Sequence, residues 1–137
     1  MIDCAYIGDS IAVGLQQVDH HCVVHAKVGA GSDFIVNNYS SKDREAYTIV
    51  SMGSNWPSNP NNYRNASKLR ASFAKAQLVI WILPYDRKAA AVIRQVAKEH
   101  GDAYVDLAVF PSKDHVHPRN YKQVSKRVDD CVTYYYD

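Results

Sequence analysis

Three residues of types that perform nucleophilic catalysis occur at two places in the sequence. Ser10 follows Gly8 and Asp9 where an apolar run gives way to helical spacing, and Asp114 and His117 stand close together near the end of the chain. A serine hydroxyl becomes an effective nucleophile when a base takes its proton, and His117 is the natural base. Asp114 would hold the histidine tautomer and stabilise the imidazolium, and its spacing lets one loop supply both residues.

Amide groups that could bind a developing oxyanion follow two other apolar runs. Gly29 and Gly31 come after the second run, and Asn55 comes after the third. A glycine N–H and an asparagine side chain, beside the N–H of Ser10 at a helix N-terminus, are suitable donors to a tetrahedral oxyanion. Gly29 follows the strand more directly and is the preferred glycine, while a shift of two residues to Gly31 stays open.

The elements that must position these residues alternate between strand and helix. Apolar runs with β-branched residues predict five strands, and the segments between them have helical spacing. We expect strands at residues 2–7, 22–28, 46–52, 77–83 and 103–109, and helices at 11–18, 32–39, 63–76, 87–100 and 118–132. Proline favours the first helical turn, so Pro118 is expected to begin the last helix directly after His117.

This alternation indicates a doubly wound α/β fold, in which a parallel sheet is covered by helices on both faces. Ligands of such sheets bind outside the carboxyl ends of the strands, and the candidate residues all follow predicted strands. A chain of 137 residues supports one hydrophobic core, which predicts a single domain over residues 1–137.

The same segments resemble the sequence blocks of the SGNH (GDSL-type) hydrolases, a family named for Ser, Gly, Asn and His. IGDSIAVG is similar to the first block, AKVGAGS to the second, SMGSN to the third and KDHVHPRNY to the last, in the family's order. The resemblance covers nearly the whole chain and implies a three-layer α/β/α fold with a flavodoxin-like five-stranded parallel sheet. It implies Ser10, His117 and Asp114 as the catalytic triad, and Ser10, Gly29 and Asn55 as the oxyanion hole.

One position departs from the family's pattern. Trp56 follows Asn55 where the third block usually has aspartate, so the hydrogen bonds within this loop must differ. The chain is also short for the family, which predicts an open cleft suited to small acyl groups on a large carrier. Trp56, Tyr85 and Arg87 follow strands and are expected at the substrate rim, where they would offer stacking surface and charge to a sugar. His115 is expected at the rim as well.

The expected function is therefore that of a serine esterase that removes acetyl or another short acyl group from a carbohydrate through an acyl-enzyme. A binding module of the same fold, for instance a glycan-recognition domain on a phage particle, is the alternative. Transfer of the acyl group to a sugar acceptor instead of water is a third possibility that no residue pattern separates from hydrolysis.

Composition narrows the choice of partner. The formal net charge of +2 is too small to indicate nucleic-acid binding, so we expect a small-molecule or glycan ester as the partner. No apolar run reaches the roughly 18 residues that a membrane span needs. The sequence does not specify the oligomeric state or the compartment, and no cofactor is expected.

The cysteines and histidines outside these segments suggest no further chemistry. Cys4 and Cys22 lie in predicted strands and form no C-x-x-C pair, so they are expected to be reduced thiols in the core. Three histidines around the second strand lack a set of other ligands at the spacing of a tetrahedral site, so no metal is predicted there: His20, His21 and His25.

Overall fold

The computed structural model describes residues 3–40, 46–73 and 75–137, and strand alternates with helix along them. The elements are β1 (Cys4–Gly8), α1 (Ser10–Val18), β2 (Val23–Ala26), α2 (Ser32–Tyr39), β3 (Tyr47–Ser51), α3 (Asn62–Ala71), β4 (Leu78–Leu83), α4 (Arg87–Glu99), β5 (Ala103–Asp106), a 3-10 turn (Leu107–Val109) and α5 (Tyr121–Tyr136).

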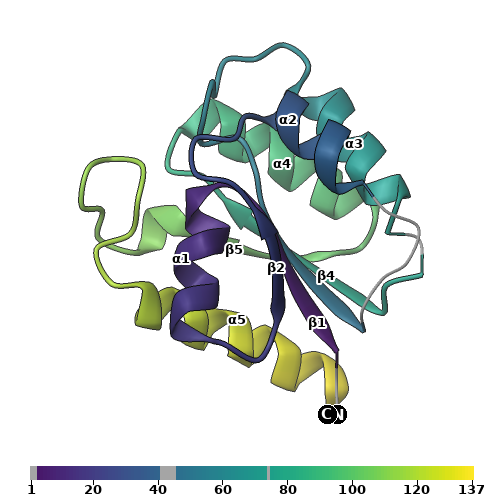
Figure 1. Ribbon diagram of the computed structural model, residues 1–137, viewed down its shortest axis with the longest axis vertical. Helices are drawn as coiled ribbons and strands as arrows, with labels where there is room; N and C mark the ends of the chain where they lie inside the picture. Colours follow the sequence, from purple (N-terminus) through teal and green to yellow (C-terminus); the bar gives the residue numbers. More distant parts are fainter. Residues whose placement is uncertain (1–2, 41–45, 74) are drawn as a thin grey trace.

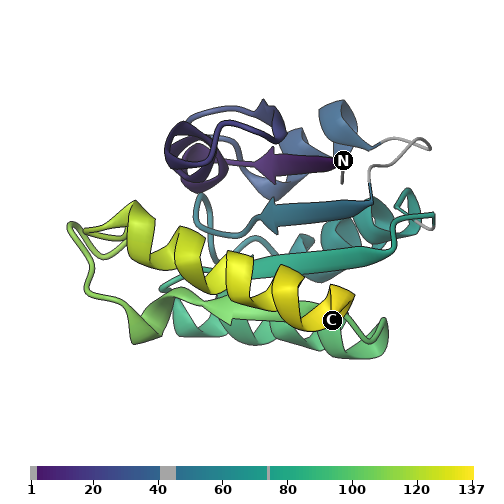
Figure 2. The same cartoon turned by 90° about the horizontal axis from the view of Figure 1, so that it is seen from below.

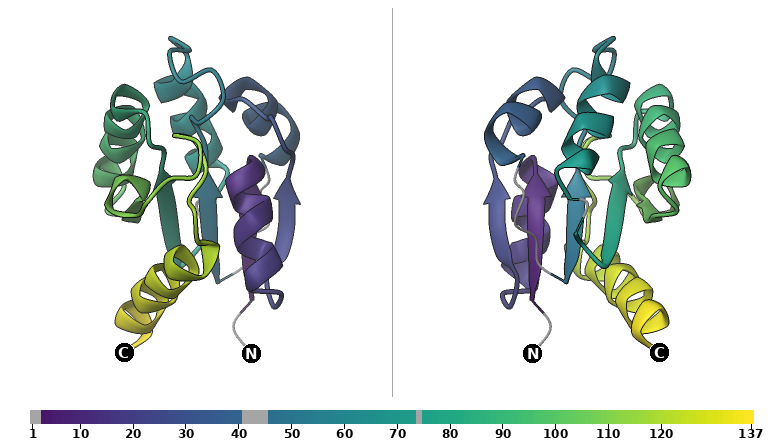
Figure 3. Two further views of the ribbon diagram at one scale, coloured as in Figure 1. Left: turned by 90° about the vertical axis from the view of Figure 1, so that its left-hand side faces the viewer. Right: turned by 90° about the vertical axis from the view of Figure 1, so that its right-hand side faces the viewer.

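The strands form one five-stranded parallel sheet in the order β2-β1-β3-β4-β5. In Figure 3 they run side by side with their carboxyl ends toward the same edge. β1, β3 and β4 are buried at every residue, which fits their continuous apolar sequences, whereas the edge strand β2 is largely exposed. The predicted α/β class and parallel sheet are confirmed.

Helices cover both faces of the sheet and make three layers (Figure 1). On one face, alternate strand residues such as Ile7 and Trp81 pack with Phe73 beneath α2, α3 and α4. On the other face, Tyr6 and Ile80 pack with the apolar residues of α1 and α5. Figure 2 shows α5 running along this second face, where it contacts β4, β5 and α1.

Several predicted boundaries were wrong, including the end of the last helix, which lies at Tyr136 and not at 132, and local hydrogen bonds explain three of the others. The last helix begins at Tyr121 and not at Pro118, because Asn120 caps it by accepting a hydrogen bond from the Lys122 N–H. β5 ends at Asp106, whose carboxylate accepts from the Ala108 N–H and starts a 3-10 turn. α3 ends at Ala71 and not at residue 76, because both the N–H and the hydroxyl of Ser72 donate to the Leu69 carbonyl.

Within the described ranges, no helix is both long enough and apolar enough to cross a membrane.

Candidate active site

Ser10 is the first residue of α1, at a sharp turn from strand into helix. Gly8 ends β1 with a φ of +138°, and a Cβ there would lie 1.8 Å from the Ser51 carbonyl oxygen of β3. Glycine therefore lets the chain turn against β3. Asp9 is the N-cap, and its Oδ1 accepts from the Ile11 N–H at 3.1 Å, which leaves the hydroxyl of Ser10 free of capping.

The structure brings Ser10, His117 and Asp114 into one hydrogen-bonded chain. Ser10 Oγ lies 2.7 Å from His117 Nε2, and His117 Nδ1 lies 2.8 Å from Asp114 Oδ2. The ionised Asp114 carboxylate only accepts hydrogen bonds, so the ring proton of His117 faces it from Nδ1. The Nε2 lone pair is then directed at the Ser10 hydroxyl, which is the arrangement in which histidine removes a proton from serine.

The loop before α5 holds His117 by hydrogen bonds of its own. Asp114 Oδ1 accepts from the N–H groups of Val116, at 3.0 Å, and of His117, at 2.7 Å. Ser112 Oγ accepts from the His115 N–H at 2.6 Å and donates to the His117 carbonyl at 3.0 Å. The hydrogen bond from the His117 side chain, followed by those from the backbone, lowers the pKa of Asp114 to about 2. Asp114 is therefore a carboxylate at any pH at which His117 would act as a base.

The second carboxylate next to Ser10 is that of Asp9, which is fully buried. Burial raises the pKa of Asp9 to about 6, although hydrogen bonds from Ser51 Oγ and the Ile11 N–H to its Oδ1 act in the opposite direction. Its Oδ2 has no hydrogen-bond partner among the described residues. The sequence analysis did not predict a buried carboxyl group next to the nucleophile.

The predicted oxyanion donors Gly29 and Asn55 lie on the loops that follow β2 and β3, and these two loops contact each other. Asn55 Nδ2 donates to the Ala30 carbonyl at 3.0 Å, and a Cβ on Gly31 would lie 3.6 Å from the Asn55 carbonyl oxygen. Gly29 has a φ of +83° and borders open space. Neither the Gly29 nor the Gly31 N–H has a hydrogen-bond partner in the described part of the chain, so both amides are available to a ligand. The role of Gly29 in an oxyanion hole stays a prediction.

A buried polar network holds the loop that carries Asn55. Asp33, in the first turn of α2, accepts from Asn59 Nδ2 at 3.1 Å and from Asn65 Nδ2 at 2.7 Å. Ser32 Oγ donates to Asn62 Oδ1 at 2.5 Å, which ties the same helix to the start of α3. These residues were not among the sequence predictions, because the network joins three segments whose relative position the sequence does not show.

The three predicted rim residues differ in whether their side chains are exposed or held by hydrogen bonds to the protein. Trp56 is 58% exposed, whereas the Tyr85 hydroxyl donates to the Phe110 carbonyl at 3.1 Å. The Arg87 guanidinium pairs with both oxygens of Asp106, at 2.9 and 3.1 Å, and so braces the start of α4 against β5. Trp56 is thus the rim residue whose side chain is most open to a substrate, and contact of any of the three with substrate stays a prediction.

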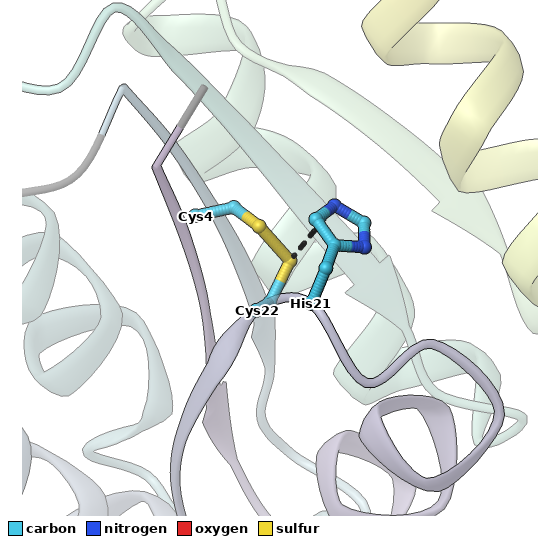
Figure 4. A group of neighbouring side chains, drawn as sticks. All are labelled: Cys4, His21 and Cys22. Carbon is cyan, nitrogen blue, oxygen red and sulfur yellow. Dashed lines mark hydrogen bonds between the residues drawn. A yellow bond between two sulfur atoms is a disulfide. The ribbon is translucent and has the colours of Figure 1, made fainter. Parts of the chain in front are cut away.

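The expected reduced state of Cys4 and Cys22 was wrong, because these residues form a disulfide (Figure 4). β1 and β2 are adjacent and pair Ala5 with Val23, so the residues directly before this pair face each other. Cys4, His21 and Cys22 also form the one group in the described ranges whose ligand atoms lie close enough for a metal, within 4.8 Å of one another. As a disulfide, the two sulfurs lack the thiolate charge that a metal ligand needs.

Comparison with known proteins identifies the fold. No protein-family model and no curated protein matches the sequence. Among solved structures, a carbohydrate acetylesterase from Sinorhizobium meliloti has a TM-score of 0.71 at 12% identity, over 98% of this chain and 99% of that one. A GDSL-like lipase from Bacteroides thetaiotaomicron has a TM-score of 0.63 at 15% identity, over 92% and 88%. The C-terminal catalytic domain of peptidoglycan O-acetyltransferase A from Streptococcus pneumoniae has a TM-score of 0.56 at 17% identity, over 97% and 91%.

These similarities show that the chain has the fold expected from the resemblance, that of the SGNH hydrolases. At such low identities the likeness concerns the fold, and the activity has to be argued from the site.

Proposed function

We propose that this protein is a serine ester hydrolase in which Ser10 is the nucleophile, His117 the general base and Asp114 its carboxylate partner. The observation that carries this proposal is the continuous hydrogen-bonded chain from Ser10 Oγ through the His117 ring to Asp114, at 2.7 and 2.8 Å. It lies at the carboxyl edge of a parallel sheet, where ligands of such folds bind.

In the first half of the reaction, Ser10 Oγ attacks the acyl carbonyl carbon while its proton passes to His117 Nε2. Asp114 stabilises the imidazolium that forms. The negative charge on the former carbonyl oxygen is stabilised by the Ser10 N–H at the start of α1, by the second Nδ2 proton of Asn55 and by a glycine amide of the 29–31 loop. When the tetrahedral intermediate collapses, the alcohol leaves with the proton from His117, and the acyl group stays on Ser10.

In the second half, water replaces the alcohol. His117, again neutral, takes a proton from the water, whose oxygen attacks the acyl carbon on Ser10. The second tetrahedral intermediate releases the carboxylic acid, and the proton on Nε2 returns to Ser10 Oγ. No step needs a cofactor.

The proposed substrate is a short acyl ester, with O-acetyl on a carbohydrate favoured. The similarity in fold to a carbohydrate acetylesterase supports this choice, as does the exposed Trp56 beside Asn55. A small-molecule or glycan ester is the expected partner, with no role for nucleic acid.

Hydrolysis of chromogenic acetate, butyrate and octanoate esters tests the proposal. Ser10→Ala and His117→Ala should each lower kcat by about a thousandfold or more, with turnover fastest on acetate in the unchanged protein. His20→Ala is the matched control, because His20 is exposed beyond the end of α1 and lies outside the site. Circular dichroism would verify that all variants fold. Full activity in a folded Ser10→Ala variant would refute the nucleophile.

A serine-directed phosphonate separates the other possible functions. A mass increase on Ser10 without ester hydrolysis would favour acyl transfer to a sugar acceptor. With neither adduct nor hydrolysis, the esterase proposal fails and a glycan-binding module becomes the better interpretation.

A further inference from the structure

A pocket of about 430 Å³ lies between three loops at the carboxyl edge of the sheet. Ser54, which precedes Asn55, and Val116, which precedes His117, form parts of its wall. The pocket therefore adjoins the place where the proposed ester binds. The other lining residues are Pro57, Pro84, Tyr85, Asp86 and His115.

Two residues beside this pocket have backbone conformations that side chains rarely adopt. Trp56, with φ of 53°, and His115, with φ of 69°, are the non-glycine residues with positive φ in the described ranges. Pro57, directly after Trp56, lines the pocket, as does His115 itself. Hydrogen bonds hold both turns, since the Asn59 N–H donates to the Trp56 carbonyl at 3.0 Å and Ser112 holds the His115 N–H. Strained backbone of this kind is concentrated at ligand-binding sites, and here both instances flank one pocket.

The wall of the pocket combines apolar surface with three polar groups that lack hydrogen-bond partners among the described residues, one of which is the buried Ser54 Oγ. Pro57, Pro84 and Val116 provide the apolar part. Asp86 Oδ1 accepts from the Ala89 N–H as the cap of α4, which leaves Oδ2 for a ligand, and the His115 ring has no hydrogen-bond partner among the described residues. Such a combination suits a pyranose ring, which has C–H faces for apolar contact and hydroxyl groups for a carboxylate and an imidazole.

The charge of the pocket restricts the kind of sugar. Asp86 is the acidic residue of the lining, and the guanidinium of the neighbouring Arg87 is already paired with Asp106 and bonded to the Pro84 and Tyr85 carbonyls. A sugar carboxylate in this pocket would meet the charge of Asp86 at short range, whereas a neutral ring could donate a hydroxyl to it. We propose, building on the esterase function above, that this pocket binds the uncharged pyranose ring that carries the acyl group.

The test compares two acetylated sugars with an ester whose alcohol is too small to fill the pocket. The substrates are an O-acetylated methyl glucoside, the matching O-acetylated methyl glucuronide with its free carboxylate, and ethyl acetate as the reference. Release of acetate by the full chain is followed for each. The glucoside should be preferred over the glucuronide by about tenfold or more in kcat/KM.

Two variants examine the polar groups separately. His115→Asn keeps a residue type that tolerates positive φ, and should lower the ratio of glucoside to ethyl acetate kcat/KM by about tenfold, through KM more than kcat. Asp86→Asn keeps the helix cap and should narrow the preference for glucoside over glucuronide. His20→Asn is the matched control, because His20 is exposed beyond the end of α1, away from the pocket.

The inference is overturned if neither variant changes these ratios, or if the unchanged protein hydrolyses the glucuronide as well as the glucoside. Either result, with ethyl acetate still hydrolysed in a manner that depends on Ser10, leaves the esterase proposal standing. Loss of the esterase proposal itself would instead appear as hydrolysis of ethyl acetate that survives Ser10→Ala.

Discussion

Two aspartates lie close to Ser10, and their surroundings shift their pKa values in opposite directions. Asp9 precedes Ser10 in the chain and is 0% exposed, whereas the Asp114 side chain, reached through His117, is 46% exposed. Burial raises the pKa of Asp9 to about 6, and hydrogen bonds from His117 lower the pKa of Asp114 to about 2.

The two carboxylates differ in the number of hydrogen bonds that they accept and in their exposure to solvent. Asp114 accepts three hydrogen bonds, from His117 Nδ1, the His117 N–H and the Val116 N–H, and keeps contact with water. Asp9 accepts two, both on Oδ1, while Oδ2 is buried without a partner among the described residues. The exposed carboxylate is therefore the one suited to stabilise an imidazolium, and the buried one fixes the turn into α1 at the expense of stability at neutral pH.

Removal of the charge of Asp114 should have the largest effect on activity and tests whether this carboxylate is the partner of His117. Asp114→Asn should lower kcat by about a thousandfold to ten-thousandfold, because an amide beside His117 Nδ1 favours the wrong ring tautomer. The free energy of unfolding should also fall at neutral pH, because the lowered pKa of Asp114 means that its charge stabilises the folded state, although solvent screening of the half-exposed side chain keeps this effect small. Steady-state hydrolysis of an acetate ester and urea unfolding measure the two effects.

Asp130→Asn is the matched control, since Asp130 is an exposed aspartate on α5. If Asp114→Asn retained a tenth or more of the activity, Asp114 would not be the partner of the base.

Much of the fold and the candidate site could be predicted from the sequence because the signals are local. Continuous apolar runs such as that of β4 indicated strands buried on both faces, and parallel strands bring their carboxyl ends to one edge. This placed Ser10 and His117 near each other, although 107 positions separate them in the chain. Their hydrogen bond is seen in the structure, whereas their catalytic roles stay predictions.

The features that could not be predicted depend on how neighbouring strands align, on which residue caps a helix, or on tertiary packing. Pairing of Cys4 with Cys22 follows from the alignment of β1 with β2, which apolar patterning does not specify. Pro118 was a plausible helix start, but it forms a bridge with Ser112 and leaves the cap to Asn120. The burial of Asp9 also comes from tertiary packing that G-D-S alone does not show.

A second test concerns the anchoring of β1, the strand that precedes Asp9. The Cys4–Cys22 disulfide links the start of β1 to the residue before β2, with a sequence separation of 18. Its removal in a Cys4→Ala/Cys22→Ala variant should lower the free energy of unfolding by about 3 kcal/mol, through the greater freedom of the unfolded chain. Urea unfolding with and without a dithiol reductant measures this.

Activity on an acetate ester at 25 °C should persist in this variant, because Ser10 lies beyond the opposite end of β1. Cys131→Ala, which removes the free cysteine and leaves the disulfide in place, is the control and should keep both the stability of the unchanged protein and its response to reductant. Equal stability of the reduced and oxidised protein would contradict a stabilising disulfide.

The smallest expected effect is on the pH dependence of the free energy of unfolding, to which the buried carboxyl group of Asp9 contributes. The pKa of Asp9 is about 6 in the folded state and 3.8 ordinarily, so its contribution to stability is full below pH 3.8 and is lost as pH rises through 6. Between pH 7 and pH 5 this contribution should grow by about 1 kcal/mol. Asp114, with a pKa of about 2, titrates below that window.

The Asp9→Asn variant keeps an acceptor for the Ile11 N–H but binds no proton. Urea unfolding should therefore show a smaller gain in the free energy of unfolding between pH 7 and pH 5 for this variant than for the unchanged protein or for Asp130→Asn. An equal gain in all three proteins would mean that Asp9 is ionised normally and that its burial carries no energetic cost.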